Sequence, residues 1–139
     1  MDKVEETSRD TRAFKPSYTK RAKEILIIDS SSDVRRLYLN LLENRYNVVA
    51  VASLKEALRV SRYTHFSYIF LSSRVYIREG SETFNNLRNK SPNTKFILMT
   101  NWMDGIGPYF EDKDKFDYHF RQPFEAKEIL SMVKKVVRK

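Results

Sequence analysis

The sequence predicts an α/β fold, a doubly wound parallel sheet of five strands with helices on both faces. Five short apolar runs, rich in β-branched and aromatic residues, are spaced along the chain. Because the runs at residues 25–28, 68–71 and 96–99 lack polar–apolar alternation, they are typical of strands buried on both faces, as in parallel sheets. The segments between them carry apolar residues at helical spacing, and alternation of strand and helix favours an α/β fold. Crossovers between parallel strands are right-handed, which places helices on both faces of the sheet.

The first two strands are followed by strong helix-start signals. Residues 25–28 form the first strand, and residues 30–33, three serines and an aspartate, are favourable N-cap residues. The second strand is expected at residues 47–51. Ser53 and Glu56 then match a capping box, which predicts a second helix. The apolar residues at helical spacing are Val34, Leu37, Tyr38, Leu41 and Leu42 in the first helix, and Leu54, Ala57 and Leu58 in the second.

The middle of the chain supplies two further apolar runs. The third strand is expected at residues 68–71 and the fourth at residues 96–99. We expect a loop after the third strand, with Gly80 near its end. A short helix is expected at residues 81–89.

The pattern weakens toward the C-terminus. By alternation, residues 101–114 hold a helix, but two glycines and a proline between residues 105 and 108 predict that it is short or irregular. The fifth strand is expected at about residues 116–120. Residues 124–137 carry one apolar stripe and form the predicted last helix.

Length and composition limit the classes of protein. The 139 residues fit one domain, which we place at residues 23–139, preceded by a charged, aperiodic and flexible tail at residues 1–22. The absence of cysteine excludes disulfides, thiolate metal sites and cysteine nucleophiles. Two histidines, His65 and His119, give little basis for a histidine-rich metal site.

The net charge of +8 favours anionic partners, including nucleic acid. Basic residues are spread along the chain without a recognised DNA- or RNA-binding motif. No stretch approaches the roughly 20 apolar residues of a membrane span. The polar N-terminus does not resemble a signal peptide, so we expect a soluble, cytoplasmic protein with no membrane contact. The C-terminal basic residues are Lys127, Lys134, Lys135, Arg138 and Lys139.

The predicted site lies at the carboxyl ends of the strands, where doubly wound sheets bind their ligands. The segments at these ends are residues 29–32, 72–74, 100–102 and 121–123. Gly80 stands eight residues after Ser72. The residues that end the strands are Asp29-Ser30, Ser72, Thr100 and Gln122-Pro123-Phe124.

In this order and spacing, residues 23–139 resemble the CheY-like receiver domains of bacterial response regulators. The resemblance implies a flavodoxin-like fold and a role in two-component signalling or a phosphorelay. It also implies that phosphoryl transfer to an aspartate needs an attacking carboxylate, acidic residues that hold Mg²⁺, a lysine and a hydroxyl. These groups act by positioning and by stabilising charge, as in phosphoryl transfer generally.

Three of these four parts are altered in this chain. Ser72 stands where the resemblance places the attacking carboxylate, and a serine without a base beside it is a poor nucleophile. Asp29 with Ser30 replaces the acidic pair, and one carboxylate is a weak site for Mg²⁺. Gln122 replaces the lysine, and Thr100 alone is retained. The sequence therefore predicts a degenerate phosphoacceptor pocket, with no metal, no cofactor and no catalytic residue.

Other interpretations of this pocket stay open. The default interpretation of Ser72 is a plain strand-end residue, and its phosphorylation by a kinase has no sequence support. The hydroxyl groups, with Arg74 and the first helix N-terminus nearby, favour an anion and allow a phosphate-bearing small molecule.

The expected partner face is formed by the fourth helix, the fifth strand and the fifth helix, which receivers commonly use. Aromatic residues and methionine are enriched in interface cores. A buried helical stripe is an equally good interpretation of the residues four apart at 102, 106 and 110. The candidate face residues are Trp102, Met103, Ile106, Tyr109, Phe110, Tyr118, His119 and Phe120.

Two functions follow from these observations. The first is a phosphorylation-independent pseudo-receiver that binds another signalling protein in bacterial signal transduction. The second is a basic, nucleic-acid-associated protein on a receiver scaffold, which uses the tail and the C-terminal helix. An enzyme is not expected, because the chain has no histidine triad, carboxylate dyad or phosphate-binding glycine loop.

Overall fold

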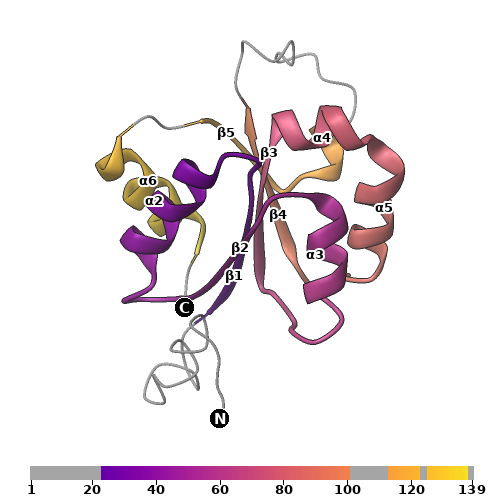
Figure 1. Ribbon diagram of the computed structural model, residues 1–139, viewed down its shortest axis with the longest axis horizontal. Helices are drawn as coiled ribbons and strands as arrows, with labels where there is room; N and C mark the ends of the chain where they lie inside the picture. Colours follow the sequence, from indigo (N-terminus) through magenta and orange to yellow (C-terminus); the bar gives the residue numbers. More distant parts are fainter. Residues whose placement is uncertain (1–22, 101–112, 123–124, 138–139) are drawn as a thin grey trace.

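The computed structural model describes residues 23–100, 113–122 and 125–137, and within them five parallel strands form one sheet (Figure 1). The strand order is β2-β1-β3-β4-β5, and every neighbouring pair is parallel. The chain therefore reverses its direction of winding beside β1, as the predicted doubly wound topology requires. The strands are β1 (Glu24–Ile28), β2 (Asn47–Val51), β3 (Tyr68–Ser72), β4 (Lys95–Thr100) and β5 (Tyr118–Arg121).

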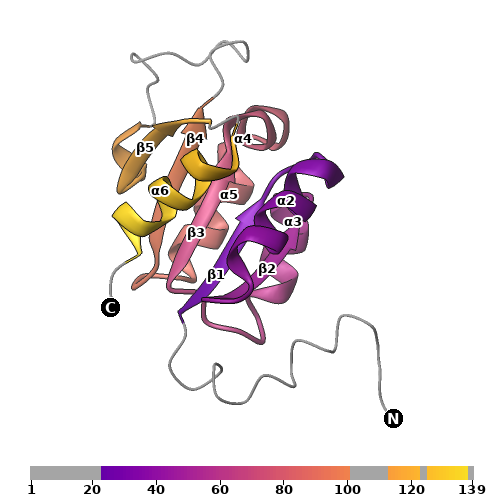
Figure 2. The ribbon, with the colours of Figure 1, turned by 90° about the vertical axis from the view of Figure 1, so that its left-hand side faces the viewer.

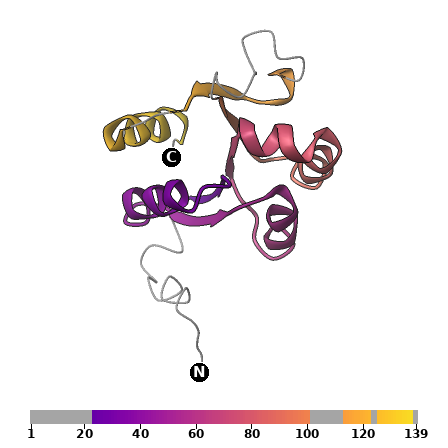
Figure 3. The same cartoon turned by 45° about the horizontal axis from the view of Figure 1, so that its top comes forward.

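Helices cover both faces of the sheet, which confirms the predicted fold class. Helices α2 and α6 lie on one face, and α3, α4 and α5 lie on the other (Figures 1 and 3). The view from the side shows α2 and α6 lying across the sheet (Figure 2). The helices are α2 (Ser32–Leu42), α3 (Leu54–Val60), α4 (Ser73–Glu79), α5 (Ser81–Asn89) and α6 (Ala126–Val136).

Alternate residues of the central strands supply two apolar cores, one on each side of the sheet. In β1, Leu26 and Ile28 pack toward α3 and α5, whereas Ile25 and Ile27 pack toward α2 and α6. All four side chains are fully buried. Burial on both faces explains why the strands read as continuous apolar runs in the sequence.

The predicted helix starts are confirmed at their caps. The Ser31 hydroxyl accepts the Val34 N–H at the start of α2. The Ser53 hydroxyl accepts the Glu56 N–H at the start of α3, and the Glu56 carboxylate accepts the Ala52 N–H in return. These bonds satisfy N–H groups that a helix leaves unpaired in its first turn.

The segment after β3 differs from the prediction. A loop was expected up to Gly80, but α4 begins at Ser73, directly after the strand. The buried side chains of Val75 and Tyr76 hold this short helix against the sheet. Gly80 then separates α4 from α5 with φ +84°, a backbone conformation that favours glycine.

The C-terminal elements are shifted slightly from their predicted bounds. Strand β5 begins at Tyr118, because Phe116 packs with the aromatic core before the strand starts. Helix α6 begins at Ala126. Of the predicted fourth helix, only the end is described, where residues 113–115 form the short 3₁₀ helix η4. The rest of that helix and the predicted tail at residues 1–22 lie outside the described residues.

Candidate functional site

A small polar pocket lies at the carboxyl ends of the strands. Its volume is about 250 Å³, and it brings together four of the five predicted pocket residues. The fifth, Thr100, does not line it, because its hydroxyl donates to the Phe120 carbonyl at 3.3 Å. The lining residues are Asp29, Ser30, Ser31, Val34, Ser72, Arg74 and Gln122.

Asp29 is the acidic residue of this pocket and is only 4% exposed. Its Oδ1 accepts the Ser31 N–H at 2.9 Å, and its backbone carbonyl accepts a hydrogen bond from the Arg35 guanidinium at 2.8 Å. Its Oδ2 is buried and has no hydrogen-bond partner in the described part of the chain. Burial raises the pKa of Asp29, and the Ser31 N–H, the charges of Arg35 and Arg74 and the nearby Gln122 side chain offset this only in part.

Ser72 ends β3 and caps the helix that follows. Its side chain is buried, and its Oγ accepts the Arg74 N–H at 3.2 Å. Because α4 begins at the next residue, this hydroxyl oxygen serves as the helix N-cap. The position that the receiver resemblance assigns to the phosphoacceptor is therefore occupied by a capping side chain.

Tyr38 lies in the core near Asp29, and sequence reasoning placed it only on an apolar helix stripe. Its hydroxyl donates to the Met99 sulfur at 2.9 Å. Burial, together with the nearby charge of Asp29, raises the pKa of Tyr38 well above its usual range. The phenol is therefore a neutral structural group.

The residues of the pocket do not fit the Mg²⁺ ion that the receiver resemblance implies. Magnesium prefers carboxylate oxygens, and the pocket offers Asp29 as its one carboxylate. Arg74 lines the same space and would repel a cation. Across the described ranges, no group of three or more histidine, aspartate or glutamate side chains is placed to hold a metal.

The described part of the predicted partner face lies on β5 and is split between the two faces of the sheet. The Tyr118 and Phe120 rings stack at a centroid distance of 6.4 Å, and Phe120 packs against the core under α6. The His119 ring lies 6.0 Å from the Phe116 ring, which belongs to the core on the other face. Side chains alternate between faces along a strand, so these three residues do not form one surface.

The remaining predicted residues of this face lie outside the described residues. They are Trp102, Met103, Ile106, Tyr109 and Phe110.

The sheet order and the polar pocket at its carboxyl edge define a doubly wound α/β protein of the receiver type. The family model of the response regulator receiver domain matches residues 25–134, and the chain belongs to this family. Receivers of this family are components of two-component signalling. No curated protein matches the chain.

Solved structures of receivers share the fold. Chemotaxis response regulator CheY4 of Vibrio cholerae is similar with a TM-score of 0.70 and 20% identity, covering 84% of this chain and 99% of that chain. The signal receiver domain of an HD domain-containing protein from Pseudomonas fluorescens Pf-5 is similar with a TM-score of 0.64 and 17% identity, covering 83% of this chain and 94% of that chain. An adenylate cyclase from Rhodopirellula baltica is similar with a TM-score of 0.68 and 21% identity, covering 82% of this chain and 86% of that chain. At these identities the similarity concerns the fold alone.

None of the helices in the described part of the chain is long and apolar enough to cross a bilayer.

Proposed function

We propose that this chain is a pseudo-receiver, a phosphorylation-independent protein-interaction module of bacterial signal transduction, and not an enzyme. The observation that carries the proposal is the state of Ser72. Its side chain is 3% exposed, carries no carboxylate and caps α4 through its bond with the Arg74 N–H. A serine activated for phosphoryl transfer needs a base bonded to its hydroxyl, and the contacts of Ser72 Oγ and Asp29 Oδ1 are with the Arg74 and Ser31 N–H groups, not with each other.

The charges of the pocket support the same conclusion. Phosphoryl transfer depends on cations and donors arranged around the transferred group. Gln122 is neutral where the resemblance places a lysine, and Asp29 with Ser30 offers one carboxylate for a metal. The function is then regulated by the presence of partners or by the amount of the protein.

A partner face at β5 and α6 is part of this proposal. Tyr118 is 39% exposed on the edge strand, and its ring stacks on Phe120. A groove of about 530 Å³ lies beside Phe120, between the end of β5 and α6. Exposed aromatic side chains beside a groove are typical of interface anchors. Substituting Tyr118→Ala should weaken partner binding without changing the unfolding free energy by more than about 0.5 kcal/mol.

The test of phosphorylation independence is incubation with a small phosphoryl donor and Mg²⁺, read by intact-protein mass. We expect no gain of a phosphoryl group. The control is the triple variant Ser30→Asp, Ser72→Asp, Gln122→Lys, which restores the groups implied by the family. Uptake of phosphoryl by the unmodified chain, abolished by Ser72→Ala, would contradict the proposal.

Nucleic-acid binding is the second candidate function, and the surface of α6 favours it. Exposed Lys127, Lys134 and Lys135 line a groove of about 790 Å³ along this helix. Lysines that neutralise phosphates make affinity fall steeply with salt concentration.

Capture of partners with and without nuclease separates the two functions. A discrete protein that survives nuclease supports the interaction module. Binding that disappears with nuclease and falls steeply with salt supports nucleic acid as the partner.

A further inference from the structure

The outward surface of α4 has a pattern that folding does not require. Ser73, Val75 and Tyr76 are buried against the sheet. Arg74, Ile77 and Arg78 are exposed and, at spacings of three and four residues, share one side of the helix. We call these three residues the α4 arginine face. Ile77 at its centre is 48% exposed, among the most exposed large apolar side chains in the described ranges.

The α4 arginine face is held in place by contacts on the opposite side of the helix. The Tyr76 ring meets the Phe84 ring at 5.3 Å and the Phe116 ring at 5.8 Å, both edge to face. The Glu79 carboxylate accepts the Leu54 N–H, at 3.1 Å to Oε1 and 3.0 Å to Oε2. A rigid support lowers the entropy lost when a partner binds.

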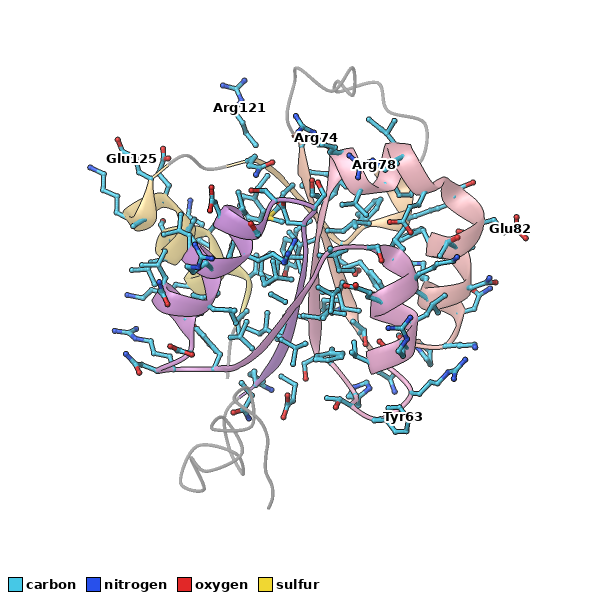
Figure 4. All side chains as sticks on the ribbon, in the orientation of Figure 1. Tyr63, Arg74, Arg78, Glu82, Arg121 and Glu125 are labelled. Atoms are coloured by element: carbon cyan, nitrogen blue, oxygen red, sulfur yellow. The ribbon has the colours of Figure 1, made fainter. Side chains whose placement is uncertain are left out.

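Three arginines lie at the carboxyl end of the sheet, and Glu125 at the start of α6 lies at the same end (Figure 4). Arg74 and Arg78 of α4, and Arg121 at the end of β5, lie where the strands end (Figure 4). Neither Arg78 nor Arg121 has an ion-pair partner within the described part of the chain. The Glu79 carboxylate is engaged by the Leu54 N–H of α3, and the Asp29 carboxylate interacts with the charge of Arg74 inside the pocket.

This arrangement is unfavourable for the isolated domain. Like charges four residues apart on a helix repel each other, as Arg74 and Arg78 do here, and Asp29 offsets the charge of Arg74 in part. An exposed isoleucine between them gains nothing from burial until another molecule covers it. An acidic segment with an apolar side chain would remove both costs.

We propose that the α4 arginine face binds an acidic segment of a partner protein, whose apolar side chain covers Ile77. This inference deepens the proposed interaction module and rests on it. The apolar centre distinguishes this surface from the lysine-lined groove of α6, because interface cores between proteins are apolar with arginine enriched. The α6 surface also holds acidic residues, and Lys127 lies 3.9 Å from the Glu125 carboxylate.

The test is a titration of the isotope-labelled full chain, followed by amide chemical shifts. The probe is a short synthetic amphipathic peptide with glutamates on one side and leucines at helical spacing on the other. Two comparison peptides replace the leucines by serine or the glutamates by lysine, and a single-stranded oligonucleotide is the fourth probe. We expect the shifts to centre on residues 74–78, with weaker binding by both comparison peptides and by the oligonucleotide.

Variants assign the binding to the surface. We expect the affinity for the peptide to fall by about tenfold or more in the double variant Arg74→Ser with Arg78→Ser, and separately in Ile77→Ser. The reason is that arginine and apolar anchors carry most of the binding energy of an interface. The matched control, Lys55→Ser with Arg59→Ser, removes the same charge from exposed positions four residues apart on α3 and should change affinity by about twofold at most. The dispersion of the amide spectrum verifies that each variant is folded.

Three results would overturn this inference: shifts that centre on α6, tighter binding of the oligonucleotide, or unchanged affinity in the α4 variants. None of them bears on phosphoryl uptake, which is measured separately by mass. The failure of this inference and the failure of the proposed function are therefore distinguishable.

Discussion

Removing the Glu79 side chain should weaken the attachment of α4 to the rest of the domain. The Glu79 carboxylate reaches across to the start of α3, where both oxygens lie within 3.1 Å of the Leu54 N. This N–H belongs to the first turn of α3 and has no acceptor within that helix. The Glu79→Ala substitution therefore leaves a partly buried donor without its partner.

The expected loss follows from the kind of bond that is removed. A hydrogen bond to a charged group contributes about 1.5–3 kcal/mol, including the favourable position of a carboxylate at a helix N-terminus. We therefore expect Glu79→Ala to lower the free energy of unfolding by about 2 kcal/mol. With a urea dependence of about 2 kcal/mol per molar, the midpoint falls by about 1 M.

Urea unfolding and amide hydrogen exchange together measure this effect. Glu82→Ala is the matched control, because it removes the same charge from an exposed position in the next helix. Glu79→Gln keeps an acceptor and should lose less stability than Glu79→Ala. Equal midpoints for Glu79→Ala and Glu82→Ala, with α4 amides equally protected, would refute the anchoring of α4 by this carboxylate.

Three further substitutions probe the core, the helix junction and the pocket. Phe84→Ala should cost about 3–5 kcal/mol of unfolding free energy in urea, because the fully buried ring packs on the rings of Tyr76, Phe96 and Phe116. Gly80→Ala should cost about 1–3 kcal/mol through backbone strain alone, since φ is +84° and an added Cβ meets nothing within 4 Å; an unchanged thermal midpoint would contradict this. Because burial raises the pKa of Asp29, the folded state holds that proton more tightly than the unfolded chain, and stability falls as pH rises between the two pKa values. Relative to the unmodified chain, Asp29→Asn should therefore become more stable as pH rises above about 4, and a pH-independent difference in unfolding free energy would count against this.

Sequence patterns predicted the elements whose cause is local or periodic. The central strands β1, β3 and β4 appear where continuous apolar runs stand in the sequence, because a central parallel strand is covered on both faces. The helix caps at Ser31 and Ser53 follow from short-range hydrogen bonding, which the sequence displays directly. The convergence of Asp29, Ser72 and Gln122 on one pocket follows from the topology of parallel sheets.

The same patterns failed where contacts between distant segments decide the structure. A helix as short as α4 is not stable by itself in water, so the local sequence does not predict it. It exists because Tyr76 packs on Phe84 and Phe116 and because Glu79 bonds the start of α3. The division of β5 side chains between two faces follows from strand alternation, but which core each ring joins depends on distant segments.

The sequence by itself determined the fold class and family of this protein, because strand burial and helical spacing are written in the order of residue types. The tertiary structure alone decided how the pocket residues are used. In the folded chain the Ser72 hydroxyl accepts the Arg74 N–H, Asp29 Oδ2 has no hydrogen-bond partner in the described ranges, and Ile77 is exposed. These states depend on packing between segments far apart in the chain, and residue order does not record that packing.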